Sequence, residues 1–412
     1  MGIHVISMCA ILAIIPLYWL PDLPDLHLVW LLIAAGVALS VQQRKWLRFS
    51  GLALLFMCWG ILAAQESVWP MNHLTKAPQQ AEVVITATDG ATMHQGKIVS
   101  LNGERVWGAM GVALYGNYLP QNVCVGQRWA MTLRLRAVHG ELNDGGYDSQ
   151  KNAFARHQTL SGRFSHAALV DEGCSLRAQY LTSLQNTLSA YQWGPVILGL
   201  GMGERLSVSR EIKNLMRETG TMHLMAISGL HIALAASVIW FLTRGIQFFL
   251  PGRWIIWQIP MLAGLIFAAF YAWLTGLQPP ALRTVIALVV LAALKMSGRQ
   301  WSPWQVWLTC VAAILVFDPL AVLSQSLALS AFAVAALIFW YQWLPLPHWQ
   351  RGRRLRPMVT LLYLQVGMLL LLLPLQVLIF HGFSLSSLVA NLFAVPLVTF
   401  ISVPLILLGM FL

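Results

Sequence analysis

Residues 358–380 read MVTLLYLQVGMLLLLLPLQVLIF, an apolar stretch without a single charged side chain. A helix needs about 20 mainly apolar residues to cross the hydrocarbon core of a bilayer. Four arginines lie just before the stretch, at positions 351, 353, 354 and 356. Because basic residues of short loops stay on the cytoplasmic side, this stretch predicts a membrane-spanning helix that begins at the cytoplasmic face.

Other stretches of the chain share this apolar character. Hydrophobic residues make up 58% of the 412 residues and charged residues only 10%, whereas about 25% of a typical soluble protein is charged. This composition excludes a fully soluble enzyme, an intrinsically disordered protein and a disulfide-dense secreted scaffold. We expect a polytopic α-helical membrane protein with about ten spans. The expected spans lie near residues 4–20, 27–41, 50–64, 222–243, 255–275, 281–297, 304–317, 328–344, 358–380 and 388–410.

The net charge of +11 is concentrated in alternate loops between these spans. A simple alternation of spans places all these basic loops in the cytoplasm and the acidic loop 21–25 outside. Both ends of the chain are then cytoplasmic, and residues 65–190 lie outside the cytoplasm. The basic residues that set this topology, besides the four arginines above, are Arg44, Lys45, Arg48, Arg244, Arg253, Lys295 and Arg299.

Residues 65–190 differ from the rest of the chain, with 10 basic and 9 acidic residues in near balance. Short β-rich runs alternate there with turn pairs such as Asn102-Gly103 and Gly145-Gly146, which indicates a small β-barrel, with the OB type as a natural candidate. A helix is expected at 175–190. The predicted domains are therefore three helices in 1–64, an OB-like domain in 65–190 and a membrane domain in 191–412. The expected strands lie at 83–88, 97–101, 105–109, 129–135 and 162–164.

The most unusual polar stretch is TGTMHLMAISGLH at 219–231, which contains His223, Ser228, Gly229 and His231. On a continuous helix Ser228 and His231 lie about 60° apart and share a face. One interpretation is a helix, possibly discontinuous, that lines a pathway through the membrane. The alternative is a packing helix whose small residues allow close approach and whose histidine bonds a neighbouring carbonyl.

Catalysis and metal binding are poorly supported by this stretch. No carboxylate lies nearby in the sequence to orient His231 against Ser228, and the Gly-x-Ser-x-Gly elbow of serine hydrolases is absent. The eight-residue spacing of His223 and His231 matches no metal-binding string. We therefore expect no catalytic residue, no metal and no cofactor.

Arg283 lies a few residues inside a predicted span, near its outer end. Such an arginine either extends its side chain to the water or attracts an anion at the external mouth of a pathway. Asp318, which precedes Pro319 at the outer end of another span, is expected to cap a helix or lie in a loop.

Two of the five cysteines, Cys124 and Cys174, fall in the predicted external domain. Disulfides form in oxidising compartments outside the cytoplasm, so these two are expected to be bridged. The alternative is a pair of buried free thiols. The other three cysteines lie in spans, where cysteine behaves as a small hydrophobic residue.

One predicted strand of the external domain carries candidate nucleic-acid-binding residues. Arg134 and Arg136 alternate and share a face, with Arg128 and Trp129 at the start of the strand. Basic and aromatic side chains on an OB-like face suit single-stranded nucleic acid. A merely solvated face is the alternative, because the balanced charge of the domain gives little long-range attraction.

Seven stretches of the sequence share one resemblance: 219–231, GLQPPALR at 276–283, FDPL at 317–320, LS at 329–330, SLVANLFAVPLV at 387–398, NDGGYD at 143–148 and FAR at 154–156. Together they resemble the ComEC family of bacterial competence proteins. The resemblance implies an inner-membrane channel that imports single-stranded DNA during natural transformation, with Asn391 among its channel-lining candidates. It also implies a bridged cysteine pair in the external loop, and the bilayer, a periplasmic DNA receptor and a cytoplasmic motor as partners.

Two departures from the family are visible in the sequence. Ala328 stands where many members have glutamine, which weakens a polar role there. Many members also continue into a metallo-β-lactamase-like domain, whereas this chain ends at Leu412 in an apolar run. We therefore expect a truncated product or a fragment without nuclease activity. Two alternatives stay open, namely a transporter for a smaller anion, such as a nucleotide or a lipid-linked phosphate, and a membrane hydrolase that uses Ser228 and His231.

Overall fold

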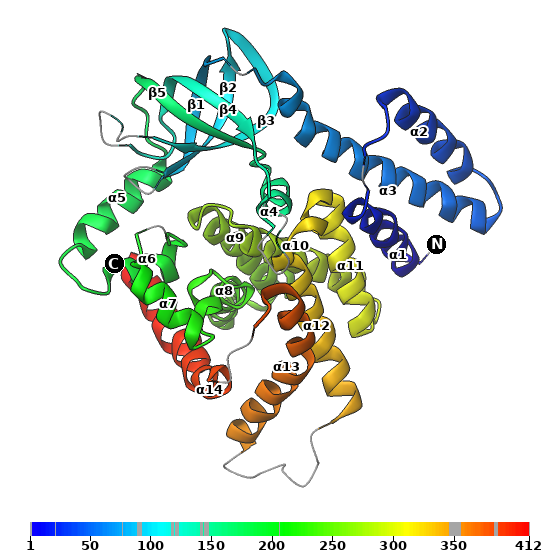
Figure 1. The fold of residues 1–412 in the computed structure, drawn as a ribbon. Helices are drawn as coiled ribbons and strands as arrows, with labels where there is room; N and C mark the ends of the chain where they lie inside the picture. The colour runs from blue at the N-terminus through cyan, green and yellow to red at the C-terminus, as the bar shows by residue number, and fades with distance from the viewer. Residues whose placement is uncertain are drawn as a thin grey trace. The chain divides into compact units, whose positions relative to one another are not determined.

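The protein forms two compact units in the computed structural model (Figure 1). Unit 1 comprises residues 1–183 and 314–325, and unit 2 comprises residues 184–313 and 326–412. The residues whose structure is described are 2–20, 22–75, 77–88, 93–116, 119, 123–140, 143, 148–205, 207–345, 356–382 and 386–411.

Unit 1 begins with three apolar helices, α1 (Ile3–Ile14), α2 (Leu26–Ser40) and α3 (Lys45–Val68). Helices α2 and α3 approach closely where Gly36 faces Gly51. A Cβ atom on Gly51 would lie only 2.6 Å from the Gly36 carbonyl oxygen. Small residues permit such contact between apolar helices, so the two glycines set the spacing of this pair.

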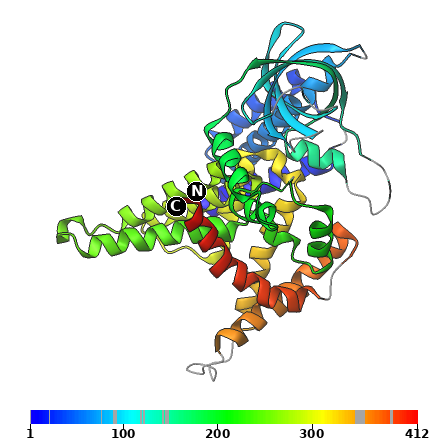
Figure 2. The same cartoon turned by 90° about the vertical axis from the view of Figure 1, so that its left-hand side faces the viewer.

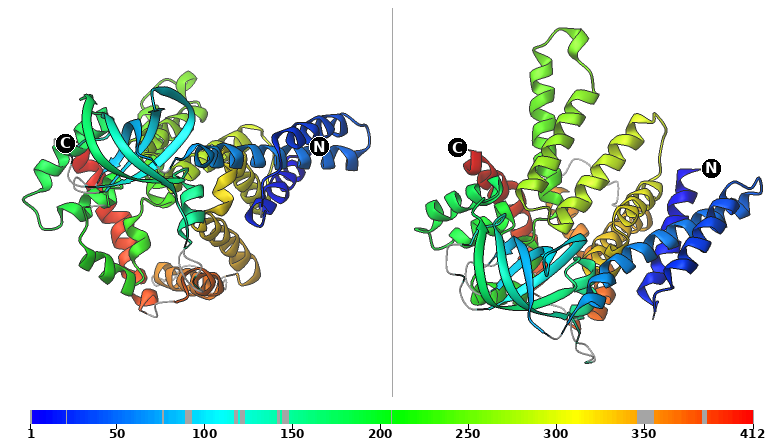
Figure 3. Two further views of the ribbon diagram at one scale, coloured as in Figure 1. Left: turned by 45° about the horizontal axis from the view of Figure 1, so that its top comes forward. Right: turned by 90° about the horizontal axis from the view of Figure 1, so that it is seen from above.

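The next part of unit 1 is a closed five-stranded barrel with the strand order β1-β2-β3-β5-β4 (Figure 3, left). All neighbouring strands are antiparallel except β3 and β5, which are parallel. The five predicted strands are confirmed, although most are longer than expected. Their bounds are β1 (Gln79–Thr88), β2 (Met93–Leu101), β3 (Glu104–Tyr115), β4 (Arg128–Ala137) and β5 (Leu160–Asp171).

Buried and more exposed residues alternate along β4 of the barrel. In β4 the odd-numbered residues from Trp129 to Leu135 point into the core, while Arg134 and Arg136 are exposed. The predicted turn Asn102-Gly103 joins β2 to β3, and both residues have positive φ, 52° and 86°. This conformation is typical of two-residue hairpins and explains the Asn-Gly pair. The turn pairs Asp89-Gly90 and Gly145-Gly146 lie outside the described residues.

The expected disulfide between Cys124 and Cys174 is confirmed, with a Cα–Cα distance of 5.8 Å. It joins the loop that enters β4 to the start of α5 (Leu176–Leu188), the helix expected at 175–190. The main-chain N–H of Ser175 donates to the Val125 carbonyl at 2.9 Å beside the bridge. The bridge and this hydrogen bond together fix the point at which the chain leaves the barrel.

A short helix missed by the sequence analysis, α4 (Ser149–Ala155), lies between β4 and β5. The side chain of Asp148 caps it by accepting from the Lys151 N–H at 2.9 Å. Helix α4 packs on the 3₁₀ turn η5 (Pro319–Leu323). The segment 314–325 is anchored to α3 as well, because the indole of Trp59 donates to the Val316 carbonyl at 2.9 Å.

Unit 2 is helical throughout its described residues. Helices α8 and α9 pack side by side as an antiparallel hairpin (Figure 2). The sequence analysis missed the first two helices, α6 and α7. The elements are α6 (Gly194–Met202), α7 (Arg210–Glu218), η3 (Met222–Met225), α8 (Gly229–Phe248), α9 (Gln258–Leu274), α10 (Pro279–Met296), α11 (Pro303–Phe317), α12 (Gln325–Trp343), α13 (Arg356–Phe380), α14 (Ser387–Leu397), a π-helical turn (Val398–Ser402) and α15 (Val403–Phe411).

Six helical segments among the described residues are long and apolar enough to cross a membrane. Four of the expected spans correspond to shorter apolar helices: Ile3–Tyr18, Leu26–Ser40, Gln258–Leu274 and Pro303–Phe317. Three of the four arginines before residue 358, at 351, 353 and 354, lie outside the described residues. The six long segments are Lys45–Asn72, Gly229–Phe248, Pro279–Met296, Gln325–Trp343, Val359–Ile379 and Ser387–Met410.

Candidate functional site

The stretch 219–231 does not form a continuous helix. Thr219 ends α7, Gly220 adopts a left-handed conformation with φ of 67°, and the chain then forms η3 and an extended link to α8. The segment is therefore discontinuous, and the break in the helix lies in the part of the chain that carries His223 and Ser228. Irregular backbone of this kind is tolerated in membrane proteins where it is covered by protein or lines a water-filled cavity.

Ser228 and His231 come together through a helix cap rather than a shared helix face. Ser228 is the N-cap of α8, and its hydroxyl accepts from the main-chain N–H of His231 at 3.4 Å. The His231 ring is 1% exposed, and its Nδ1 atom has no hydrogen-bond partner among the described residues. The described contact joins the Ser228 hydroxyl to the main chain of His231, so it is not the Ser-His side-chain pair that a hydrolase uses.

His223 lies in η3, where its Nδ1 atom is 3.0 Å from the Gly220 carbonyl oxygen. The ring therefore stabilises the turn between α7 and η3. This is the contact expected of a histidine that is satisfied by a neighbouring carbonyl.

Gly229 is a packing residue in this structure. A Cβ atom at this position would lie 2.6 Å from Oγ1 of Thr284 on α10. Real Cβ atoms do not approach other atoms so closely, so the absence of a side chain lets α8 and α10 meet. This contact favours the packing alternative for Gly229, because a side chain at this position would point at α10.

Arg283 is buried in the first turns of α10, with 9% of its surface exposed. Its Nε atom donates to the Pro279 carbonyl at 3.2 Å, and an Nη atom donates to the Ser326 hydroxyl of α12 at 2.9 Å. An arginine that extends its side chain to the water would be exposed. The burial of Arg283 therefore does not fit this alternative. The guanidinium is held inside unit 2, between the N-terminal turns of two helices, where helix dipoles also favour an anion.

Asn391 lies in α14, ahead of Pro396 and of the π-helical turn. Its Oδ1 atom is buried and has no hydrogen-bond partner among the described residues. Buried polar atoms nearly always have a protein or water partner. Asn391 and His231 thus both offer unused hydrogen-bonding capacity in the interior of unit 2.

The short helix α6 packs against α15 and η3 within unit 2. It ends at Gly203, whose φ of 76° places it in the left-handed region. A Cβ atom there would meet Ile227 at 3.1 Å and the Thr275 carbonyl at 3.3 Å. The Tyr271 hydroxyl of α9 donates to the Gly201 carbonyl at 3.2 Å. These contacts bring the end of α6, the link before α8 and the end of α9 to one junction.

The outer face of the barrel carries a cluster of arginines on β4 and β5. Arg134 on β4 is directly opposite Arg163 on β5, and Arg136 follows on the same face. None of these three forms a salt bridge with a described residue. Like charges opposite each other on neighbouring strands repel, so this arrangement favours an anionic ligand. Arg128 is exposed at the start of β4, opposite Asp171.

Trp129 does not belong to this basic face. Its side chain is 0% exposed in the barrel core, and its indole donates to Gln127 Oε1 at 3.2 Å. The burial of Trp129 does not support its place among the candidate nucleic-acid-binding residues. Successive side chains of a strand point to opposite faces, and Trp129 has the opposite parity to Arg134 and Arg136.

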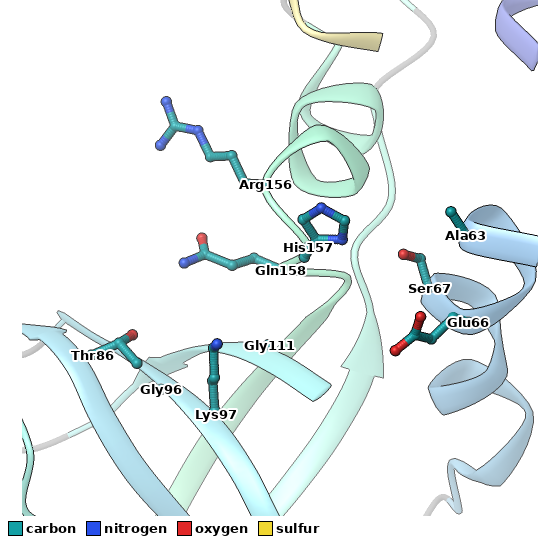
Figure 4. A pocket seen from close by; sticks show the side chains of 10 residues that line it. All are labelled: Ala63, Glu66, Ser67, Thr86, Gly96, Lys97, Gly111, Arg156, His157 and Gln158. Carbon is teal, nitrogen blue, oxygen red and sulfur yellow. The ribbon is translucent and has the colours of Figure 1, made fainter. Parts of the chain in front are cut away.

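A cavity of about 380 Å³ lies between the barrel and α3 in unit 1. Glu66 and Ser67 reach toward it from α3, Lys97 and Thr86 line the strand side, and His157 lies between them (Figure 4). Its lining therefore mixes one carboxylate with several basic groups.

His157 connects this cavity to the segment 314–325. Its Nε2 atom donates to Asp318 Oδ1 at 3.2 Å. This hydrogen bond raises the pKa of His157 above its ordinary value. Burial opposes the rise, the nearby carboxylates of Asp318 and Glu66 support it, and Lys97 opposes it. Asp318 occupies the N-cap position of η5 but makes no side-chain capping bond.

The His157–Asp318 contact predicts a pH-dependent stability. Because the folded-state pKa of His157 is raised, the contribution is complete below about pH 6.5, the ordinary pKa, and is lost as the pH rises through the raised value. We expect Asp318→Asn to lower the pKa of His157 and to remove this pH dependence. Thermal unfolding from pH 5 to pH 9 would test it, with Asp171→Asn as the control. An unchanged pH profile in Asp318→Asn would contradict the assignment.

A family model described as Competence protein matches residues 200–412, which is more than half of the chain. The chain belongs to the competence protein family. It is similar to the Uncharacterized protein YcaI of Escherichia coli (strain K12), with 59% identity over 410 residues, 100% of this chain and 54% of that protein. Together with the six long apolar helices, this membership indicates a membrane protein.

Two further relatives cover most of this chain. Recombination protein 2 of Haemophilus influenzae is 32% identical over 91% of this chain and 47% of its own length. Competence protein ComA of Neisseria gonorrhoeae is 29% identical over 84% of this chain and 50% of its own length. The chain thus spans about half the length of the curated relatives it matches. No solved structure matches it.

Several residues of these sites escaped the sequence analysis. The place of Arg163 beside Arg134 depends on the β4–β5 register, and that of Ser326 on its hydrogen bond with Arg283. The sequence alone indicates neither. Helix α7 could have been found, because Ser209 is an N-cap that precedes an amphipathic run. Tyr271 and His157 carried no recognisable signal, since their partners lie 70 and 161 residues away in the sequence.

Proposed function

We propose that this chain is the channel component of a DNA-uptake system and imports single-stranded DNA across the bacterial inner membrane in natural transformation. Membership in the competence family carries the proposal. The relatives named Competence protein ComA and Recombination protein 2 support it, because one name refers to competence and the other to recombination.

The proposed topology has about ten spans, a cytoplasmic N-terminus and a periplasmic barrel of the OB type. The strand order and the parallel pairing of β3 with β5 support the OB assignment. The disulfide supports an oxidising location for the barrel. In this arrangement residues 1–64 supply three spans, residues 65–190 the external domain and residues 191–412 the channel domain.

The arginine face of β4 and β5 is the proposed first contact for DNA. Arg134 and Arg163 repel each other in the absence of an anion, and a phosphodiester backbone would neutralise both. Because Trp129 is buried, binding here would depend on phosphate contacts rather than on stacking with this residue. Such contacts carry no sequence information, as uptake of arbitrary DNA requires.

Within unit 2 the proposed route passes the junction of α6, α8, α9 and α10. Arg283 supplies a buried positive charge, while His231 and Asn391 supply buried polar atoms without described partners. These groups fit a water-containing path for a polyanion. His223 and Ser228 hold the discontinuous segment in place through their backbone contacts, and Gly229 permits its packing.

The proposed partners are single-stranded DNA, the lipid bilayer, a periplasmic DNA receptor and a cytoplasmic motor. We propose a transport role rather than an enzymatic one. Ser228 is engaged as a helix cap, which disfavours the hydrolase alternative. A transporter for a smaller anion would use the same buried Arg283. An assay of DNA uptake is therefore needed to distinguish a DNA channel from a transporter for a smaller anion.

The double variant Arg134→Gln/Arg163→Gln tests the proposal. For single strands the slope of log K against log salt is about −0.7 per phosphate contact, so we expect the slope for an oligo(dT) ligand to become shallower by about 1.4. Binding to the purified chain would be measured by fluorescence anisotropy. In a transformable host, uptake of labelled DNA by the full-length variant should fall at equal membrane abundance.

Arg105→Gln is the matched control, because Arg105 lies on β3 opposite Ser100, on another part of the barrel. It should leave the salt slope unchanged. Equal slopes for the double variant and the wild type would remove the arginine face from the proposal. Normal DNA uptake after deletion of the gene would contradict the DNA channel itself and favour the smaller-anion transporter.

A further inference from the structure

A second cavity, of about 850 Å³, lies within unit 2 between α8, α9, α10 and the start of α11. On α8 its lining extends from Ala233 to Arg244. At 1.5 Å per residue this is a length of about 16 Å. The cavity is therefore an elongated groove that follows a helix.

The inner part of the groove is lined by small and aliphatic residues, among them Ala233, Ala236 and Leu288. Aromatic residues gather toward the end formed by the C-terminal half of α8 and the start of α9. Trp240 is 38% exposed, Phe241 is 68% exposed and Trp257 is 44% exposed. Partly exposed tryptophans are typical of the boundary between hydrocarbon and water.

Two basic residues, Arg244 and Lys295, line the same end. The Lys295 ammonium lies 5.7 Å from the centre of the Trp257 ring. No acidic residue lines the groove, and the sequence from 219 to 317 contains no aspartate or glutamate at all. The end of the groove thus has a positive charge that no lining carboxylate neutralises.

A buried glutamine holds this end in shape. Gln247 is 2% exposed, and its Oε1 atom accepts from Arg244 Nη1 at 3.2 Å. Its Nε2 atom donates to the carbonyls of Trp254 and Ile256, each at 3.0 Å. One side chain therefore fixes both Arg244 and the loop that leads to Trp257.

We propose that this groove binds one anionic phospholipid, with an acyl chain along α8 and the phosphate between Arg244 and Lys295. Apolar walls suit an acyl chain, and basic pockets between spanning helices bind anionic head groups. A DNA strand would need polar contacts along the whole length of the groove, whereas the basic groups lie at one end. The proposal is independent of DNA uptake, because it rests on the groove and its charges alone.

The protein purified in detergent would be titrated with phosphatidylglycerol and followed by native mass spectrometry. Phosphatidylcholine with the same acyl chains is the comparison lipid. We expect Arg244→Gln and Lys295→Gln each to weaken phosphatidylglycerol binding about fivefold, and the double variant more than tenfold. Arg253→Gln is the control, because Arg253 is exposed in the α8–α9 loop and does not line the groove.

Ser237→Phe provides a second test that leaves both charges in place. Ser237 lines the groove and is exposed, so the larger side chain would obstruct the acyl chain without entering a packed core. Loss of phosphatidylglycerol binding in this variant, with unchanged helix content, would support the proposal. Equal binding of the two lipids, or undiminished binding in the double variant, would overturn it. Displacement of the lipid by oligo(dT) would instead assign the groove to DNA.

Discussion

Removal of the Cys124–Cys174 disulfide should lower the free energy of unfolding of the barrel by about 4 kcal/mol. The bridge closes a loop with a sequence separation of 50, and cross-links over such lengths act mainly by restricting the unfolded chain. We expect Cys124→Ser/Cys174→Ser to unfold at lower temperature and to be less abundant in the membrane.

Cys9→Ser is the control for this prediction, since Cys9 is a free cysteine in α1. On gels without reductant the wild type and Cys9→Ser should migrate faster than the double variant, and reductant should abolish the difference. Identical migration of all three, with Cys124 and Cys174 open to alkylation after unfolding, would show that no bridge forms. We expect the loss of the bridge to lower the abundance of the protein rather than to change the selectivity of transport.

The secondary structure of the barrel could be predicted from its short β-rich runs and turn pairs, and along β4 buried and exposed residues alternate. The same alternation would have excluded Trp129 from the basic face, since residue 129 differs in parity from residues 134 and 136. The pairing of Arg134 with Arg163 could not be predicted. It depends on the register of β4 against β5, which the closure of the barrel determines.

The apolar helices could be predicted from hydrophobicity. The junction of α6, the link before α8 and the end of α9 could not. Hydropathy identifies α8 as a span, yet it does not distinguish a continuous helix over 222–243 from one that begins at Gly229 after a broken segment. Helix α6 has only nine residues, too few to span a bilayer. Its role depends on contacts with α9 and α15 that are distant in the sequence.

Gly229→Ala should destabilise unit 2 by about 1–3 kcal/mol, the usual cost of overpacking. The added Cβ would lie 2.6 Å from Thr284 Oγ1, and α8 and α10 would have to move apart. We expect lower membrane abundance and a lower unfolding temperature. In a transformable host the full-length variant should show a corresponding loss of DNA uptake.

The double variant Gly229→Ala/Thr284→Ala separates packing from obstruction of a pathway. Removing Oγ1 leaves the Thr284 Cβ as the nearest of these side-chain atoms, at 3.7 Å from the new methyl group, an ordinary contact. If Gly229 serves packing, the second substitution should restore stability and uptake, so that the two effects are strongly non-additive. If Gly229 lines the route, uptake should stay low even when abundance recovers. Gly245→Ala is the matched control on the same helix, because a Cβ there meets nothing within 4 Å.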